Sequence, residues 1–153
     1  EILRCLVGSE MCIRDRFRET VLAVNRRDYT QKEVEDWASC STAERLEELI
    51  TNLYFIVALD GDKRIVGMAS LRNDGYLHSL FVHKDFQRRN IATLLLNEIE
   101  RYARVHGIYS LTSEVSLTAR PFFERKGFQV KSAQRRKANK LYMSNFLMEK
   151  HLA

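Results

Sequence analysis

The chain has 153 residues, of which 45% are hydrophobic and 29% charged, and its Lys and Arg residues outnumber its Asp and Glu residues by 25 to 20. This length allows one hydrophobic core but not two ordinary domains, and a single proline with six glycines argues against linkers and low-complexity tails. No apolar run approaches the roughly 20 residues that a membrane-spanning helix requires, which excludes an integral membrane protein.

The first sixteen residues, EILRCLVGSEMCIRDR, differ from the rest of the chain. Their apolar residues follow neither helical nor strand spacing, and the string CLVGSEMCIRDR resembles translated sequencing-adapter sequence. We therefore expect residues 1–16 to be a non-native leader and residues 17–153 to form one domain, with a genuine first strand over residues 1–7 as the alternative. Cys5, Cys12 and Cys40 are odd in number and suit neither a disulfide framework nor a zinc site, so a reducing cytoplasm is expected.

Three helices are predicted before the first strand of the domain. Apolar residues at i, i+4 and i+7 from Phe17 predict an amphipathic helix over residues 17–25. Capping-box patterns, T-x-x-E from Thr30 and S-x-x-E from Ser41, each predict a further short helix.

An antiparallel meander follows these helices. Residues 53–59 and 64–71 are rich in β-forming residues and are joined by an Asp-Gly pair, which is a hairpin signal. A second turn, over residues 73–75, leads into a strand that runs from residue 76 to residue 82.

A charged turn connects this strand to a leucine-rich helix. The first backbone N–H groups of a helix lack partners, and the helix dipole adds partial positive charge there. Two arginines in the turn strengthen the attraction for an anion, so the sequence predicts a phosphate or pyrophosphate site. The residues of this turn are Gln87, Arg88, Arg89, Asn90, Ile91 and Ala92.

The helix after the turn keeps an apolar stripe from Ile91 to Tyr102 and is predicted to end at Gly107. Because a helix separates the strand ending at Val82 from the next strand, over residues 109–115, these two strands should be parallel neighbours. Parallel neighbours that diverge leave a crevice beyond their carboxyl ends, which is where ligands bind in α/β sheets.

The last part of the chain is predicted to hold a short helix and two strands. Thr118 is expected to cap the helix and Gly127 to end it, before strands near residues 128–130 and 141–148. The order is therefore ααα-βββ-α-β-α-ββ. Residues 125–140 hold seven basic residues and no acid; a solvent-exposed hairpin is the favoured interpretation, and a nucleic-acid surface is the alternative.

The sequence resembles the GNAT family of N-acetyltransferases from about residue 17 onward. The family signature, Q/R-x-x-G-x-G/A after a strand ending L-x-V, corresponds to QRRNIA at residues 87–92 after LFV at residues 80–82. Asn90 replaces the first glycine, and asparagine is the residue that best tolerates a left-handed backbone after glycine. The segment ARPFFERKGF at residues 119–128 is also typical of the family. Several short segments of the sequence most resemble bacterial members of the YafP type.

The resemblance implies an α/β (α+β) acyl-CoA N-acyltransferase fold: a mixed, mostly antiparallel sheet with a parallel central pair, flanked by helices. It implies acetyl-CoA as the co-substrate and no metal. The backbone of the turn at residues 87–92 would hold the pyrophosphate. The exposed backbone of Leu80, Phe81 and Val82 would pair with the pantetheine arm.

An amine acceptor must lose a proton before it attacks a thioester, so a base is required. The family often places it on the strand that ends at Val82, where His78 is the first candidate and Tyr76 a partner or water holder. Glu114, on the neighbouring strand, is the third candidate. The alternative is that all three are ordinary strand residues.

Many family members use a tyrosine before the Gly-Phe pair to protonate the departing thiolate, and this chain has Phe123 there. Phe123 is expected to pack near the acetyl group or the pantetheine, and solvent, the proton of the amine or Ser116 would replace the tyrosine. Cys40 is a conceivable nucleophile, but a lone cysteine between helices is more often inert. Direct transfer in a ternary complex is therefore expected.

Tyr29 and Trp37 would lie over the acceptor side of the crevice if the family pattern holds, where an aromatic pair can bind a ring or a cation; the alternative is that Trp37 only anchors its helix. The expected acceptor is a primary amine of a small molecule or peptide, and a homodimer is compatible with the sequence. Two alternatives stay open: an acetyl-CoA-binding regulatory module without catalysis, and a nucleic-acid-associated protein.

Overall fold

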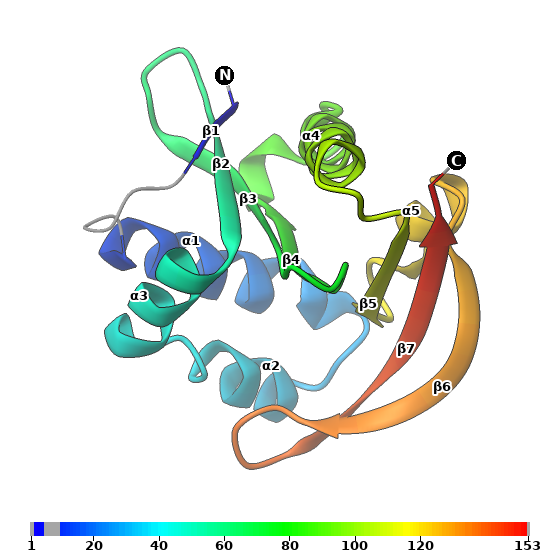
Figure 1. Cartoon of the computed structure of the whole chain (residues 1–153). Coiled ribbons are helices and arrows are strands. Elements are labelled where there is room, and N and C mark those ends of the chain that lie inside the picture. Colours follow the sequence, from blue (N-terminus) through cyan, green and yellow to red (C-terminus); the bar gives the residue numbers. More distant parts are fainter. Residues whose placement is uncertain (1, 5–9, 153) are drawn as a thin grey trace.

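In the computed structural model, which describes residues 2–4 and 10–152, the strands form two antiparallel sheets. The first sheet has the order β1 (Ile2–Arg4), β2 (Tyr54–Leu59), β3 (Ile65–Leu71) and β4 (Leu77–Val82). The second has the order β5 (Ser110–Ser116), β7 (Tyr142–His151) and β6 (Gln129–Lys137). Figure 1 shows the sheets meeting along β4 and β5 and diverging from there.

Helices cover both faces of the first sheet (Figure 1). On one face lie α1 (Glu10–Ala23) and α3 (Ala43–Asn52), which bury Ile13 and Leu46 against β2 and β3. On the other face lies α4 (Ile91–Val105), whose Leu95 and Ile99 are fully buried in the largest cluster. The short helices η1 (Asn25–Arg27), α2 (Gln31–Ala38), η2 (Lys84–Phe86) and α5 (Arg120–Arg125) complete the described elements.

The strands β4 and β5 are joined only near their beginnings. A parallel bridge pairs Tyr76 with Thr112, whose N–H donates to the carbonyl oxygen of Gly75 at 3.0 Å. The hydroxyl of Ser113 donates to the carbonyl oxygen of Leu77 at 2.8 Å, and both groups are buried. Beyond this point no strand pairing links β4 to β5 within the described residues, so the two backbones are left with unpaired edges.

Gly75 permits this junction because the backbone of β5 comes very close to it. A Cβ atom on Gly75 would lie 2.2 Å from the carbonyl oxygen of Ser110, and the residue has a φ of +92°. Both the space and the backbone angle therefore require glycine.

A buried ion pair ties the two sheets together a second time. Glu100 of α4 is 7% exposed, and it accepts from the Lys150 ammonium of β7 at 2.8 Å. Arg104 lies 3.6 Å from the other carboxylate oxygen of Glu100. Because an unpaired buried carboxylate is costly, this pair holds α4 against the second sheet.

From α1 onward the element order agrees with the sequence prediction, and β4 and β5 are parallel as predicted, although one bridge joins them and they belong to different sheets. The predicted boundaries differ in several places. The helix predicted over residues 17–25 begins at Glu10, and the strand predicted near residues 128–130 extends through Lys137 as β6. The prediction of a non-native leader over residues 1–16 falls partly outside the described residues. The pairing of β1 with β2 leaves that prediction open, because pairing does not reveal the origin of a segment.

Two predicted helix caps are wrong. Thr42, and not Ser41, caps α3: its side chain accepts from the N–H of Arg45, while the buried Ser41 hydroxyl donates to the Ala38 carbonyl oxygen. Thr118 does not cap α5, which begins after Ala119 without a side-chain cap. The capping box at Thr30 is confirmed, with both of its hydrogen bonds present.

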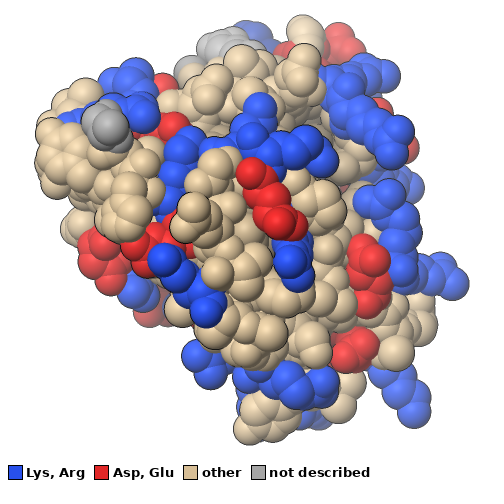
Figure 2. Space-filling view, turned by 90° about the vertical axis from the view of Figure 1, so that its right-hand side faces the viewer, with Lys and Arg blue, Asp and Glu red and all other residues tan. Residues whose placement is uncertain are grey.

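The predicted basic stretch lies mostly on β6 and in the turn that follows it. The strand is exposed along almost its whole length. Figure 2 shows Lys and Arg side chains spread over this side of the molecule with Asp and Glu side chains between them. A solvent-exposed hairpin therefore remains the favoured interpretation, since a nucleic acid backbone requires a more continuous basic strip.

Replacing Ser113 with alanine should destabilise the junction of β4 and β5. The Leu77 carbonyl oxygen would stay buried and lose its donor, which costs about 1–3 kcal/mol. Urea unfolding of Ser113→Ala measures this loss. Ser132→Ala, at an exposed position of β6, is the matched control and should stay within about 0.5 kcal/mol of the parent chain. Equal unfolding free energies for the two variants would contradict the structural role of Ser113.

Candidate active site

The turn between β4 and α4 has the left-handed backbone that the sequence predicts. Asn90 precedes the first residue of α4 with φ 62° and ψ 14°, and Arg88 has φ 60°. The Asn90 side chain makes no capping hydrogen bond. The first N–H groups of α4 therefore remain available at the surface of the turn, as an anion site requires.

Gln87 and Arg89 serve the turn in ways that the sequence did not predict. The Gln87 amide donates to the carbonyl oxygens of Val82 at 2.6 Å and His83 at 3.3 Å, so it braces the end of β4. The Arg89 guanidinium lies 5.1 Å from the centre of the Phe86 ring and lines neither of the cavities described below. Arg88 is thus the arginine of this turn that faces a cavity.

The free edge of β4 faces the gap between the sheets. The N–H of His83 bonds to the Val66 carbonyl oxygen of β3. Since antiparallel pairs alternate between bonded and non-bonded positions, Phe81 also faces β3, and Leu80 and Val82 direct their N–H and C=O groups toward the gap. The Val82 carbonyl oxygen already accepts a hydrogen bond from the Gln87 side chain. The remaining groups offer a strand-like edge to an extended ligand.

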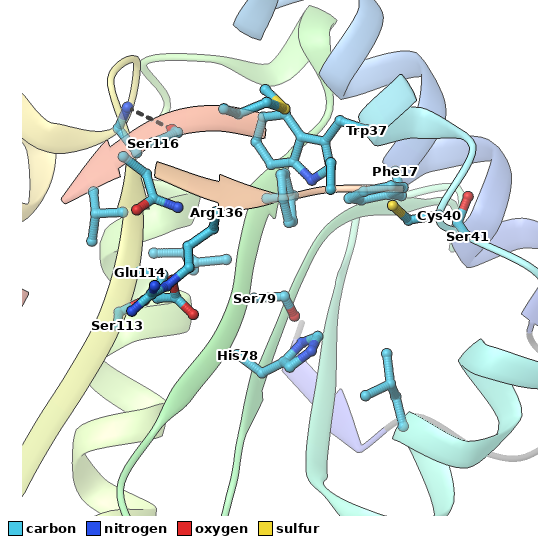
Figure 3. A pocket seen from close by; sticks show the side chains of 18 of the residues that line it. Phe17, Trp37, Cys40, Ser41, His78, Ser79, Ser113, Glu114, Ser116 and Arg136 are labelled. Carbon is cyan, nitrogen blue, oxygen red and sulfur yellow. Dashed lines mark hydrogen bonds and ion pairs between the residues drawn. The ribbon is translucent and has the colours of Figure 1, made fainter. Parts of the chain in front are cut away.

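Two neighbouring cavities, of about 540 and 450 Å³, occupy the two ends of this gap. The smaller cavity is bounded by α5 and by the turn where the resemblance leads us to expect acetyl-CoA, and for that expectation we call it the donor cavity. The larger lies between β4, β5, the first three helices and the β6–β7 hairpin, where the amine is expected, and we call it the acceptor cavity (Figure 3). The two share a wall, named here the waist, made by Leu80, Phe81, Ser116, Ala119 and Phe123.

His78 stands where β4 bulges. Ser79 pairs with Ser70 and Leu77 pairs with Leu71, so His78 is the extra residue on β4. Bulges of this kind redirect a side chain, often beside an active site. The His78 ring lines the acceptor cavity, and its Nδ1 atom is buried without a hydrogen-bond partner (Figure 3).

Burial lowers the pKa of His78 below its ordinary value, and the positive charges of Arg45 and Arg72 lower it further. Glu114 acts in the opposite direction but does not reverse the shift. His78 is therefore neutral at neutral pH and can accept a proton.

Glu114 is held by three neighbours on the opposite wall of the acceptor cavity. Its Oε2 atom accepts from Gln134 at 2.5 Å and from Arg136 at 3.1 Å, and its Oε1 atom lies 3.4 Å from the Tyr76 hydroxyl. Burial, together with the Glu114 carboxylate, raises the pKa of Tyr76 to about 12, so Tyr76 is a donor and not a base. Both oxygens of Glu114 already accept hydrogen bonds, whereas His78 Nδ1 has no partner and is free to engage a ligand.

Arg136 and Gln134 were not predicted as members of the site. Both lie on β6, which is joined to the rest of the sheet only through β7, and a basic hairpin gave no sign that it would bend over the cavity. Asp36 fixes this bend: its carboxylate accepts from the backbone N–H groups of Asn139, Lys140 and Leu141 at 2.9–3.0 Å.

At the waist, the Ser116 hydroxyl oxygen accepts from the Ala119 N–H at 3.1 Å and from the Asn25 amide at 3.4 Å. Its own proton is left for a further acceptor. Asn145, opposite Ser116 on β7, has a buried amide oxygen without a partner, and it also lines the acceptor cavity. Phe123 is 4% exposed and packs edge-to-face on Phe128.

The two predicted aromatic residues, Tyr29 and Trp37, have different structural roles. Tyr29 is buried, and its hydroxyl donates to the Ser144 carbonyl oxygen at 2.7 Å and accepts from the Leu117 N–H at 2.9 Å, so it clamps two segments together. Trp37 is partly exposed and lies edge-on to Phe17 and Phe81, with ring centres 6.3 and 6.0 Å away. Figure 3 shows Trp37 and Phe17 above His78, as part of the cavity roof.

Known proteins resemble this chain in sequence. Residues 25–150 match the acetyltransferase (GNAT) domain family. The uncharacterized N-acetyltransferase YafP of Escherichia coli K12 is 29% identical over 132 residues, which cover 86% of this chain and 83% of that protein.

Two solved structures have the same fold. A GCN5-related N-acetyltransferase from Rhodopseudomonas palustris superposes with a TM-score of 0.94 at 24% identity, covering 99% of this chain and 95% of the other. The PaiA N-acetyltransferase from Thermoplasma acidophilum, solved in complex with coenzyme A, gives 0.82 at 21% identity, with 99% and 98% covered. The predicted fold class is thereby confirmed.

Replacing Asn90 with valine should weaken the binding of acetyl-CoA. A β-branched residue in the left-handed region costs about 1–3 kcal/mol, so the turn would relax and affinity would fall roughly 5- to 150-fold. Isothermal calorimetry on Asn90→Val measures this, and Asn90→Gly, which keeps the turn, is the control. Parent-like affinity in the valine variant would show that the left-handed turn is not needed.

Proposed function

This chain belongs to the GNAT acetyltransferase family, and we propose that it moves the acetyl group of acetyl-CoA onto an amine of a small molecule or peptide by direct attack in a ternary complex. The observation that carries the proposal is the waist shared by the donor and acceptor cavities. A thioester that ends there from one side meets an amine from the other, so no acylated enzyme is required. The Cys40 thiol also argues against one, because burial raises its pKa.

The donor cavity suits a long, polyanionic ligand. Its polar lining includes Arg27, Arg88, Arg125 and Lys126, and the hydroxyl of Thr118 is buried there without a partner. The N–H groups at the start of α4 would hold the pyrophosphate, and the edge of Leu80 and Val82 would hold the pantetheine arm. When bound, acetyl-CoA supplies a thioester carbonyl that an amine can attack.

His78 is the proposed proton acceptor. The neutral amine nitrogen forms a bond to the carbonyl carbon, the carbon–sulfur bond breaks, and the proton of the amine passes to His78 directly or through one water molecule. A neutral imidazole is required for this step, and the burial of His78 provides it. On the opposite wall of the cavity, the hydrogen bond between Tyr76 and Glu114 holds both side chains in place.

Ser116 is the proposed donor to the departing thiolate. Its hydroxyl oxygen already accepts two hydrogen bonds, which leaves its proton directed to a third group. A thiolate with a pKa near the ~8.5 of a free thiol leaves readily, so a hydrogen bond suffices and full proton transfer is not needed. Phe123 fills the position at which many family members have tyrosine and keeps the waist apolar.

A cytoplasmic location is part of the proposal. The thiols of Cys12 and Cys40 are free, as a reducing compartment would keep them. In the part of the chain that the structure describes, no helix combines the length and the apolar character needed to cross a membrane.

Replacing His78 with alanine should lower kcat by roughly 100- to 10,000-fold and leave acetyl-CoA affinity unchanged. The parent enzyme, saturated with both substrates, should lose activity as the pH falls below the ordinary 6.5 of imidazole, because the pKa of His78 is lowered and only its neutral form accepts a proton. The residual activity of His78→Ala should not show this loss at low pH, which is the acid limb of the pH profile. Release of free thiol from acetyl-CoA provides the assay.

His151→Ala is the matched control, since His151 is an exposed histidine on β7. It should retain parental kcat and the parental pH profile. Undiminished turnover in His78→Ala, with the acid limb intact, would remove His78 from the role of base and transfer it to Glu114.

A further inference from the structure

We propose that the acceptor amine carries a carboxylate on an apolar body, and that Arg45 binds this carboxylate. This inference rests on the proposed function and names its substrate class. It is drawn from the charges, the open hydrogen-bonding groups and the apolar walls of the acceptor cavity.

The acceptor cavity has a surplus of positive charge. Arg45, Arg136 and Lys137 line it, and among the described residues of its lining Glu114 is the one acid. Arg136 and Glu114 neutralise each other through their ion pair. Two cations, Arg45 and Lys137, therefore face an acceptor without an acid in the cavity to balance them.

Arg45 is the better anchor of the two because its backbone is fixed. It lies in the first turn of α3, where its N–H donates to the Thr42 hydroxyl. Its one ion pair among the described residues joins a single guanidinium nitrogen to Glu48 at 3.4 Å, and both side chains are about half exposed, at 49% and 60%. Such a pair is weak, so the rest of the guanidinium fork remains open to a carboxylate.

Arg45 and His78 act on the same space. Both line the acceptor cavity, and the charge of Arg45 is one of the influences that lower the pKa of His78. The waist belongs to the lining of this cavity as well, so an acceptor whose carboxylate binds Arg45 holds its amine in the cavity that contains both His78 and the waist.

One wall of the cavity, beside Arg45, is apolar. Apolar side chains from α1–α3 and from the first sheet form the wall beside Arg45. They are Phe17, Trp37, Leu46, Leu49, Phe55, Met68 and Phe81. An aliphatic or aromatic body packs on this wall.

The charge also excludes one group of acceptors. Polyamines and aminoglycosides keep several ammonium groups in addition to the one that reacts, and their binding requires acidic side chains. This cavity would instead repel them, because its one acid already has three partners. Polycations should therefore be poor substrates.

Matched amines with and without a carboxylate test the proposal. We would compare 4-(aminomethyl)benzoate with benzylamine and phenylalanine with 2-phenylethylamine, and use spermidine and kanamycin as polycations. Acetylation is followed by thiol release from acetyl-CoA, and binding by calorimetry with coenzyme A present. In at least one pair the carboxylated amine should have the higher kcat/KM, by about 10- to 100-fold, the range of one charge-assisted hydrogen-bonded contact.

Arg45→Gln should abolish this preference, because kcat/KM falls much more for the carboxylated amine than for its uncharged partner, while Arg45→Lys should restore part of it. Arg26→Gln, at an exposed arginine of η1 that lines neither cavity, is the control and should keep the full preference. This pattern also separates Arg45 from a purely structural role, since misfolding would lower the turnover of both amines.

The two proposals fail in different ways. Acetylation of spermidine or kanamycin in preference to every carboxylated amine, or an Arg45→Gln variant that keeps the preference, would overturn the acceptor class and leave the transferase function standing. Acetyl-CoA binding with no turnover of any amine would overturn the proposed function. The acceptor class would then be supported if calorimetry showed Arg45-dependent binding of the carboxylated amines, and overturned if it did not.

Discussion

The site depends on one close contact, the approach of the β5 backbone to Gly75. The contact fixes β4 and β5 together at their beginnings, and the Ser113 hydroxyl reinforces it through the Leu77 carbonyl oxygen. Since strands twist, two neighbours that are joined at one end and belong to different sheets separate toward the other end. The gap that results exposes the edge of β4 and gives the two cavities a common waist.

Electrostatics divides this gap into two functional halves. Helix N–H groups and arginines make the donor cavity attractive to a polyanion. In the acceptor cavity, positive charge and burial together keep His78 neutral, while Arg136 neutralises Glu114. The β6–β7 hairpin brings Arg136 into place, and the Asp36 carboxylate holds the tip of that hairpin to α2. The position of Arg136 beside Glu114 thus depends on a contact outside the cavity.

Sequence reasoning recovered the features that local rules determine. Period, caps and turn residues gave the element order, and Asn90 gave the left-handed turn that the structure contains. The partners of Glu114 could not be predicted, because Gln134 and Arg136 reach it only when a long hairpin bends across the cavity. Arg45 was missed for a similar reason: a helix-surface arginine gives no local signal that the helix borders a cavity.

A crystal structure of the protein with bound coenzyme A tests the central claim most directly, because the claim concerns where two substrates meet. The account predicts a pyrophosphate on the N–H groups of residues 88–92, a pantetheine arm along Leu80 and Val82, and a thiol at the waist beside Ser116, open to His78. A pyrophosphate bound elsewhere, or a thiol on the outer surface of β5 with no path to the acceptor cavity, would contradict it.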